Sequence, residues 1–140
     1  MNILVDTNVF LDYLLNRDEF GEEARTFFRN CYNHRFKTFL TSMSIRDIEY
    51  VARKLYKDKD RARAIALGAY SICAKVLSLT SDAAISAIYS NQKDFEDALI
   101  IETAKLEDIQ LIVTSNIKDF ENADFPVVTP REFNQKINTI

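Results

Sequence analysis

Short apolar runs alternate with longer segments of helical periodicity along the chain, and this alternation constrains the fold more than any other feature. Each run ends in polar or turn-forming residues, as buried strands do. The predicted strands are Ile3–Val5, Phe36–Leu40, Val76–Leu79, Leu111–Thr114 and, last, Val127–Val128. Because strands separated by helices need crossover connections, they lie parallel in one sheet that carries helices on both faces. The sequence therefore predicts an α/β protein, a three-layer α/β/α sandwich around a central parallel sheet of four to five strands.

The segments between the strands carry apolar residues at spacings of three and four, which is typical of helices packed on a core. One of Asp6, Thr7 and Asn8 is expected to cap the first of them. The predicted helices are Val9–Leu15, Phe20–Tyr32, Met43–Tyr56, Asp60–Ala74, Ala83–Ser90 and Phe95–Leu106. No internal repeat or low-complexity segment is visible. We therefore expect residues 1–140 to form a single domain.

Composition excludes several other classes of protein. Apolar residues make up 47% of the 140 residues and charged residues 28%, the balance of an ordinary soluble protein. The start of the chain lacks the basic lead and apolar stretch of a signal peptide, and no apolar run approaches the roughly 18 residues of a membrane span. Cys31 and Cys73 form neither a paired-ligand motif nor a disulfide framework. We expect a cytoplasmic protein with two buried thiols and no membrane contact.

The formal net charge of −3 by itself argues against a nucleic-acid partner, but the charge is unevenly distributed. Between Arg46 and Arg63 the chain holds seven Lys and Arg residues against four Asp and Glu residues, a local charge of +3. A basic patch beside an acidic pocket would suit a metal-dependent nuclease. The alternative is a solvated pair of helices with ordinary charge pairs, which is what charge runs usually mean.

Acidic residues follow the predicted strands at the edge where parallel strands end. Asp6 directly follows the first strand, and the polar run Thr114–Asn116 closes the fourth. Asp47 falls in the first turn of the helix after the second strand. Asp94 and Asp97 are three residues apart near the start of a helix, so they share a face. Because ligands of open α/β sheets bind outside the carboxyl ends of the strands, we expect these acids to converge there.

The residue types at this edge suit a hard divalent cation. Several carboxylates at one mouth repel each other unless protons or a cation neutralise them. Mg²⁺ and Mn²⁺ take oxygen ligands and leave coordination positions for a phosphate, whereas the lack of His and Cys clusters argues against zinc. Taken singly, each acid is better explained as a helix cap or first-turn residue. Their combination favours Mg²⁺ or Mn²⁺ and a phosphate-bearing substrate.

Three motifs resemble those of PIN-domain ribonucleases, over a span from Ile3 to Phe120. The segment Val5–Asp12, VDTNVFLD, resembles the opening motif of that family, and Thr41–Ile48, TSMSIRDI, resembles the middle motif. Asp97–Ile101 followed by Leu111–Phe120 resembles the closing motifs in order and spacing. The resemblance implies a compact α/β/α domain and a divalent-metal endoribonuclease.

The resemblance also implies partners. Many members of this size are the toxin halves of toxin–antitoxin pairs, of the VapC-like sort. Such a protein is expected to be a homodimer, to be inhibited by a small cognate antitoxin, and to cut structured RNA such as transfer RNA. The helix Phe20–Tyr32 is rich in Phe and is a candidate surface for dimerisation.

Asp6, Asp47 and Asp97 are the metal ligands that the resemblance implies, and Asp94 is a further catalytic candidate. The middle acid of the family is usually Glu, and here Glu49 stands two residues after Asp47. A shift of two residues turns a helix by about 200°, so only one of the two can face the pocket. Motif register favours Asp47, with Glu49 as the alternative.

A second departure from the family pattern is Asn116, where many members have Asp. Asn can still ligate a cation through its carbonyl oxygen, but it adds no charge. Asp94 or Asp119 would then supply the missing carboxylate, and Asp94 is favoured because it lies one helical turn from Asp97.

Uncharged residues near the acids have supporting roles to consider. Thr7 and Asn8 either position a water or a phosphate or act only as turn residues. Thr114 and Ser115 can hydrogen-bond a ligating carboxylate. His34 has no acidic partner motif and is interpreted as a surface residue. The aromatic residues Phe27, Phe28, Tyr50 and Tyr56 are assigned to the core or a dimer interface.

Two other functions compete with the ribonuclease hypothesis. A phosphoacceptor signalling domain needs a nucleophilic Asp after a middle strand and a Lys after a late strand, and only Lys118 meets either condition. A PIN-like module that has lost catalysis and serves protein interaction is favoured by the uncharged Asn116.

Overall fold

The computed structural model describes residues 1–137, and its centre is a five-stranded sheet in which every neighbouring pair is parallel. The strand order is β3-β2-β1-β4-β5. The strands are β1 (Asn2–Val5), β2 (Lys37–Thr41), β3 (Lys75–Leu77), β4 (Leu111–Val113) and β5 (Val127–Val128). The predicted parallel α/β sheet is confirmed. Residues 138–140 of the predicted 1–140 domain lie outside the described residues.

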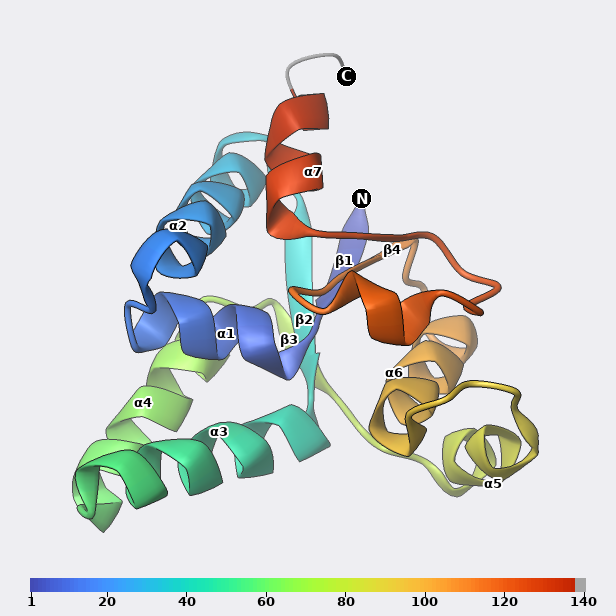
Figure 1. The fold of residues 1–140 in the computed structure, drawn as a ribbon, viewed down its shortest axis with the longest axis horizontal. Helices are drawn as coiled ribbons and strands as arrows, with labels where there is room; N and C mark the ends of the chain where they lie inside the picture. The colour runs from blue at the N-terminus through green and yellow to red at the C-terminus, as the bar shows by residue number, and fades with distance from the viewer. Residues whose placement is uncertain (138–140) are drawn as a thin grey trace.

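All six predicted helices are present, with ends shifted by three residues or fewer (Figure 1). They are α1 (Thr7–Leu14), α2 (Asp18–Asn33), α3 (Ser42–Tyr56), α4 (Lys59–Ser71), α5 (Ser81–Tyr89) and α6 (Phe95–Leu106). The short 3₁₀ helix η1 (Ile117–Phe120) and the last helix α7 (Pro130–Lys136) were not predicted. A capping box between Thr129 and Glu132, with Pro130 at the first helical position, starts α7.

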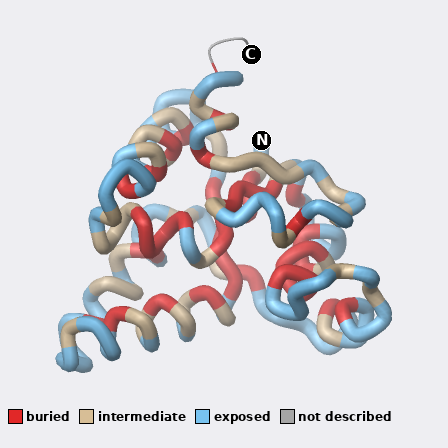
Figure 2. The backbone as a smooth tube through the Cα atoms, viewed as in Figure 1, coloured by how far each residue is buried: buried red, intermediate tan, exposed pale blue. Residues whose placement is uncertain are grey.

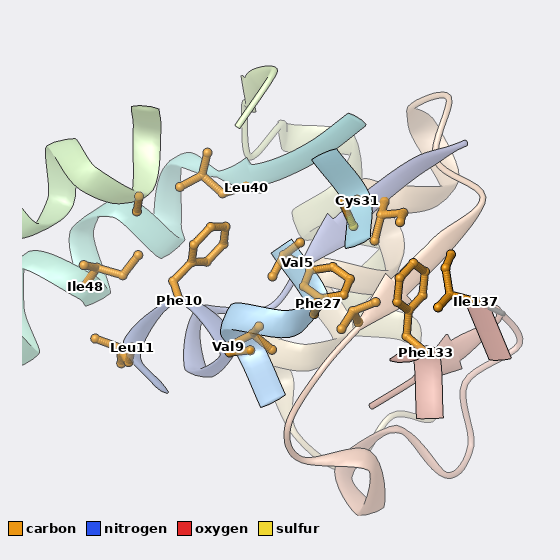
Figure 3. Packing of buried hydrophobic residues seen from close by; sticks show 14 residues of the cluster. Val5, Val9, Phe10, Leu11, Phe27, Cys31, Leu40, Ile48, Phe133 and Ile137 are labelled. Atoms are coloured by element: carbon orange, nitrogen blue, oxygen red, sulfur yellow. The ribbon is translucent and has the colours of Figure 1, made fainter. Parts of the chain in front are cut away.

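The two faces of the sheet pack against different helices, which makes the three layers. Ile3 and Val5 of β1 join one core cluster with side chains of α1, α2, α3, α4 and α7 (Figure 3). Leu4, between them, joins a second cluster with Ile100 of α6 and Phe120 of η1. This assignment follows from the alternation of side chains along a strand. The α/β/α sandwich is therefore confirmed.

Burial follows the layers, with buried backbone at the centre and exposed backbone at the tip of the α3–α4 hairpin (Figure 2). Phe27 is fully buried and Phe28 packs against the same core, as predicted. Tyr50 is not a core residue, because 44% of it is exposed, and its alternative assignment to a dimer interface stays a prediction. Burial raises the pKa of both Cys31 and Cys73 to about 12. Within the described residues, no helix combines the length and the apolar character needed to cross a bilayer.

The middle strand of the sheet, β1, sets the position of the site. From β1 the chain winds outward to β2 and β3 on one side and to β4 and β5 on the other. Val5 is in register with Val113, and the amide of Asp6 donates to the carbonyl of Val113 at 2.9 Å. Asp6 and Thr114 therefore emerge side by side at the carboxyl edge. The strand order changes direction at β1, and α/β sheets bind ligands at the carboxyl edge beside such a point.

Candidate functional site

A pocket of about 430 Å³ opens at this edge. Its walls are the first turns of α1 and α6, one face of α3, and the segment that includes η1. Two other pockets are larger, at about 560 and 600 Å³, but one is lined by no carboxylate and the other by two. The pocket at the sheet edge is lined by six carboxylates, those of Asp6, Asp47, Asp94, Glu96, Asp97 and Asp119. The predicted convergence of acids at the sheet edge is therefore present in the structure.

Asp6 is the most deeply placed of these acids, with 6% of its surface exposed. Its backbone is extended, so it caps α1, and its Oδ1 accepts a hydrogen bond from the Thr7 amide at 2.8 Å. Its Oδ2 accepts from the Thr114 hydroxyl at 2.8 Å. Burial raises the pKa of Asp6, more than these two hydrogen bonds lower it. The carboxylate is thus fixed in orientation and is costly to ionise without a cation.

Asp97 and Asp94 are linked at the start of α6. Asp94 caps the helix, and its Oδ1 accepts a hydrogen bond from the Asp97 amide at 3.1 Å. Asp97 is buried, whereas Asp94 is exposed. Burial first, and then the neighbouring charges of Asp6, Asp94, Asp119 and Glu96, raise the pKa of Asp97 to about 8. Like charges gathered at one point therefore favour either a proton or a cation there.

Asp119 completes the tightest group. One carboxylate oxygen from each of Asp94, Asp97 and Asp119 lies within 4.8 Å of the other two. The Asn116 side-chain amide donates a hydrogen bond to the Asp119 carboxylate. Asp94 and Asp119, the two acids expected to replace a carboxylate at position 116, therefore both line the pocket, and Asn116 lines it beside them.

The two candidates for the middle acid take different positions on α3. Asp47 lines the pocket and pairs with Arg46 at 3.0 Å. Glu49 is not part of the lining and pairs with Arg53, one helical turn away, at 2.7 Å. The rotation of the helix thus favours Asp47 as the acid available to a ligand in the pocket.

Supporting hydroxyl groups divide between the pocket and the layer behind it. Thr114 reaches Asp6 as predicted, but Ser115 donates to Asp12, which lies outside the pocket lining, at 2.8 Å. The Thr7 hydroxyl is engaged with the buried Ser44 hydroxyl at 2.8 Å, so it ties α1 to α3. Asn8 is exposed on the pocket wall.

Glu96 is the pocket acid that the sequence analysis did not single out. It lines the pocket and its charge raises the pKa of both Asp6 and Asp97. Its position in the first turn of α6, beside two other acids, was the available signal. His34 is exposed, its Nδ1 lies 2.9 Å from the Asn30 carbonyl oxygen, and it takes no part in the pocket, as predicted.

The donor set fits a hard divalent cation. Every candidate ligand atom is a carboxylate or amide oxygen, and no His or Cys lines the pocket. Burial and the neighbouring negative charges together raise the pKa of Asp97, and a bound cation would neutralise those charges.

Comparisons with known proteins agree with this geometry. The family model described as the PIN domain matches residues 2–118. No curated protein matches the sequence. The structure is similar to that of a toxin–antitoxin complex from Klebsiella pneumoniae, with 25% identity, a TM-score of 0.65, and coverage of 91% of this chain and 97% of that one.

Two further solved structures share the fold at lower identity. DNA-bound VapBC from Salmonella typhimurium is 20% identical with a TM-score of 0.70, covering 93% of this chain and 98% of that one. VapC20 from Mycobacterium tuberculosis, described as a sarcin-ricin loop cleaving toxin, is 16% identical with a TM-score of 0.64, covering 88% and 95%.

The family match includes the elements that build the pocket. It begins in β1 and ends in η1, and it contains five of the six pocket carboxylates, with Asp119 the next residue after it. Since the match spans most of the chain, this protein belongs to the PIN-domain family.

Proposed function

We propose that this PIN-domain protein is an endoribonuclease that hydrolyses RNA phosphodiester bonds with Mg²⁺ or Mn²⁺, and that it is the toxin of a toxin–antitoxin pair. The observation that carries the proposal is the gathering of six carboxylates in one pocket, two of them with raised pKa values. Repulsion between so many carboxylates is unfavourable when no cation is bound, and a divalent cation that faces a phosphate would offset it.

The similar structures support the finer parts of the proposal. One belongs to a toxin–antitoxin complex and another is described as cleaving the sarcin-ricin loop. Both are covered almost completely by this chain. The proposed partners of this protein are a structured RNA, with transfer RNA as one candidate substrate, and a cognate antitoxin.

Asp6, Asp97 and Asp47 are the proposed ligands, with Asp94 and Asp119 close enough to Asp97 to share the charge. When bound, Mg²⁺ or Mn²⁺ would lower the pKa of a water molecule and offset the negative charge of the phosphate. The Thr7 amide and the Thr114 hydroxyl hold the two oxygens of Asp6, so that carboxylate needs no reorientation. Asp97 would release its proton as the cation binds. The exposed side chains of Asn8 and Asn116 line the pocket, and we propose that they contact the substrate.

Cleavage of RNA by the purified protein tests the proposal. We expect cleavage of total RNA with Mg²⁺ or Mn²⁺, none with EDTA, and loss of cleavage in Asp6→Asn and in Asp97→Asn. Asp82→Asn, which changes an exposed acid of α5 outside the pocket, is the matched control and should cleave normally. Undiminished, metal-independent cleavage by both pocket variants would overturn the proposal. Circular dichroism establishes that each variant is folded.

We also propose that residues 1–140 form one domain, that the protein acts in the cytoplasm, and that it is a homodimer. Helix α2 packs on the core through one face, and among its aromatic residues only Phe20 and Tyr32 are largely exposed. Helix α5 exposes Ile85, Ile88 and Tyr89 and is the better candidate for the dimer surface. Light scattering on the wild type and Ile88→Asp tests this, with a dimer expected to become a monomer.

One alternative keeps support from a specific observation. The uncharged Asn116 fits a PIN-like module that has lost catalysis and serves only protein interaction. Calorimetric titration with Mn²⁺ separates the two, because an interaction module has no need to bind the cation. The phosphoacceptor hypothesis gains no such support, since Lys118 is exposed and is not part of the pocket lining.

A further inference from the structure

Helix α3 connects the acidic pocket to the basic tip of the α3–α4 hairpin. The pocket is lined from α3 by Met43, Asp47 and Tyr50, with their neighbours Arg46 and Val51, at the spacing of one helix face. Lys54 is the next residue on that face, and its ammonium lies 5.4 Å from the centre of the Tyr50 ring. The pocket wall therefore continues along α3 into the positively charged part of the hairpin.

The cations of the hairpin differ in whether a carboxylate neutralises them. Arg46 pairs with Asp47 and Arg53 pairs with Glu49. Among the described residues, no carboxylate pairs with the five other cations, which are all exposed: Lys54, Lys57, Lys59, Arg61 and Arg63. We call these five residues the tip cations.

Aromatic rings orient two of the tip cations without cancelling their charge. The Arg61 guanidinium lies 3.7 Å from the centre of the Tyr56 ring, and Lys54 lies over Tyr50. An aromatic ring attracts a cation but carries no net charge, so the positive field remains. Two acids lie among the tip cations in sequence. Asp58 accepts hydrogen bonds from the amides at the start of α4, and the exposed Asp60 forms no ion pair among the described residues. The charge pairs that would make this an ordinary solvated hairpin are therefore mostly absent.

The arrangement places opposite charges at the two ends of α3. The helix rises by about 1.5 Å per residue, so the tip lies about 20 Å from the pocket end of α3. A polyanion with one phosphate in the acidic pocket is repelled by the exposed carboxylates at its rim. Its neighbouring phosphates gain attraction if the strand runs along α3 toward the tip (Figure 1).

We propose that the tip cations bind the phosphate backbone of an RNA strand on one side of the phosphodiester that the pocket cleaves. This proposal rests on the proposed function and adds the path that the bound RNA strand takes outside the pocket, along α3 toward the tip. The contact is made by charge alone, so it holds RNA without reading its sequence.

Binding of RNA in the absence of a divalent cation tests the proposal without requiring cleavage. The probe is a fluorescein-labelled single-stranded RNA of mixed sequence, followed by anisotropy in EDTA over a range of salt concentrations. The tip variant carries Lys54→Gln, Lys57→Gln and Lys59→Gln. The control variant carries Arg29→Gln, Lys37→Gln and Lys75→Gln. It removes one exposed cation from α2 and one from the amino end of each of β2 and β3, the edge of the sheet opposite the pocket.

We expect the tip variant to bind RNA about tenfold more weakly or worse at low salt, and to lower the slope of log K against log salt by about 2, as for three lost phosphate contacts. The control variant should bind like the wild type. Equal affinity of the tip variant and the wild type, or an equal loss in both variants, would overturn the proposal. An acidic segment of a protein partner would then be the better ligand for the tip.

The outcome is separable from that of the proposed function. Metal-dependent cleavage by the wild type together with unchanged RNA binding by the tip variant would overturn only the role of the tip. Selective loss of RNA binding in the tip variant, without any cleavage by the wild type, would support the tip and overturn the nuclease.

Discussion

The Thr114 hydroxyl donates a hydrogen bond of 2.8 Å to the Asp6 carboxylate, although 108 residues separate the two in the chain. The parallel register of β1 and β4 makes them neighbours, since each directly follows one residue of the Val5–Val113 pair. The Thr114 hydroxyl oxygen also accepts a hydrogen bond from the backbone amide of Asn116 at 3.1 Å. One buried hydroxyl therefore orients an acid of the pocket and the loop that carries Asn116.

Thr114→Val should weaken Mn²⁺ binding and RNA cleavage by about 10- to 100-fold, the usual effect of losing a partner of a ligating carboxylate. The variant removes a hydrogen bond that lowers the pKa of Asp6. It also leaves the backbone amide of Asn116 without its acceptor. Calorimetry and a cleavage assay measure the two effects. Thr114→Ser keeps the hydroxyl and should restore most of both. Wild-type affinity in the valine variant would show that the hydrogen bond does not matter.

Stability without metal should depend on pH through Asp97. Its pKa is about 8 in the folded protein against an ordinary value of 3.8, so from about pH 4 to pH 8 the folded state holds a proton that the unfolded state has lost. Its contribution to the free energy of unfolding is therefore largest below about pH 4 and falls as pH rises to about 8. Asp97→Asn cannot ionise, so urea denaturation in EDTA should show it gaining on the wild type as pH rises. A constant difference across this range would contradict the assignment.

Asp47→Asn should lower cleavage substantially, whereas Glu49→Gln should leave it near the wild-type rate. Asp47 lines the pocket, while Glu49 lies outside the lining and is paired with Arg53. Each substitution removes one negative charge from α3, so the pair is internally controlled. Initial rates at saturating Mn²⁺ make the comparison. The reverse ranking would assign the middle acid to Glu49.

Asn116→Asp should bind Mn²⁺ more tightly than the wild type and be less stable in EDTA. The asparagine amide now donates to the Asp119 carboxylate, and a second carboxylate there would repel it until a cation arrives. Thermal denaturation with and without Mn²⁺ should therefore show a larger stabilisation by the cation in the variant. An unchanged response to Mn²⁺ would place position 116 outside the cation's reach.

Gly21→Ala should destabilise the protein by about 1–3 kcal/mol, although alanine is the better helix former by about 1 kcal/mol. A Cβ at this position would lie 2.7 Å from the Asp12 carbonyl oxygen, so α2 would be forced away from α1. Gly68→Ala is the matched control in α4, because its Cβ would meet only a flexible Leu14 methyl group, at 3.2 Å. Urea denaturation of both variants should separate them clearly.

The sequence predicted those parts of the site that depend on strand ends. Asp6 and Thr114 directly follow two strands, and parallel strands end at a common edge, so their proximity follows from apolar periodicity alone. The choice between Asp47 and Glu49 could not be made in this way. Both flank the apolar stripe of α3 at similar angles, and the rotation of α3 is set by its packing against α4, α1 and β2.

Glu96 was overlooked because its position in the first turn of α6 is already explained by the helix dipole. The structure places Glu96 in the pocket lining, where its charge raises the pKa of Asp6 and of Asp97. Helix α7 is a different case, since Thr129-Pro130-Arg131-Glu132 is a recognisable start signal that the analysis of apolar runs passed over. Tyr50 was assigned to the core or an interface by helical spacing, which does not show that its face of α3 borders a pocket.

The central place of β1 has a consequence for the order of biosynthesis. The first strand to leave the ribosome is the one that the rest of the sheet must later enclose, and Asp94, Asp97, Thr114 and Asp119 all come from the last third of the chain. A nascent polypeptide therefore carries Asp6 long before the residues that orient it and share its charge have been made. A half-translated chain therefore lacks four of the six carboxylates that line the pocket, so the proposed activity would begin only once nearly the whole chain has been made.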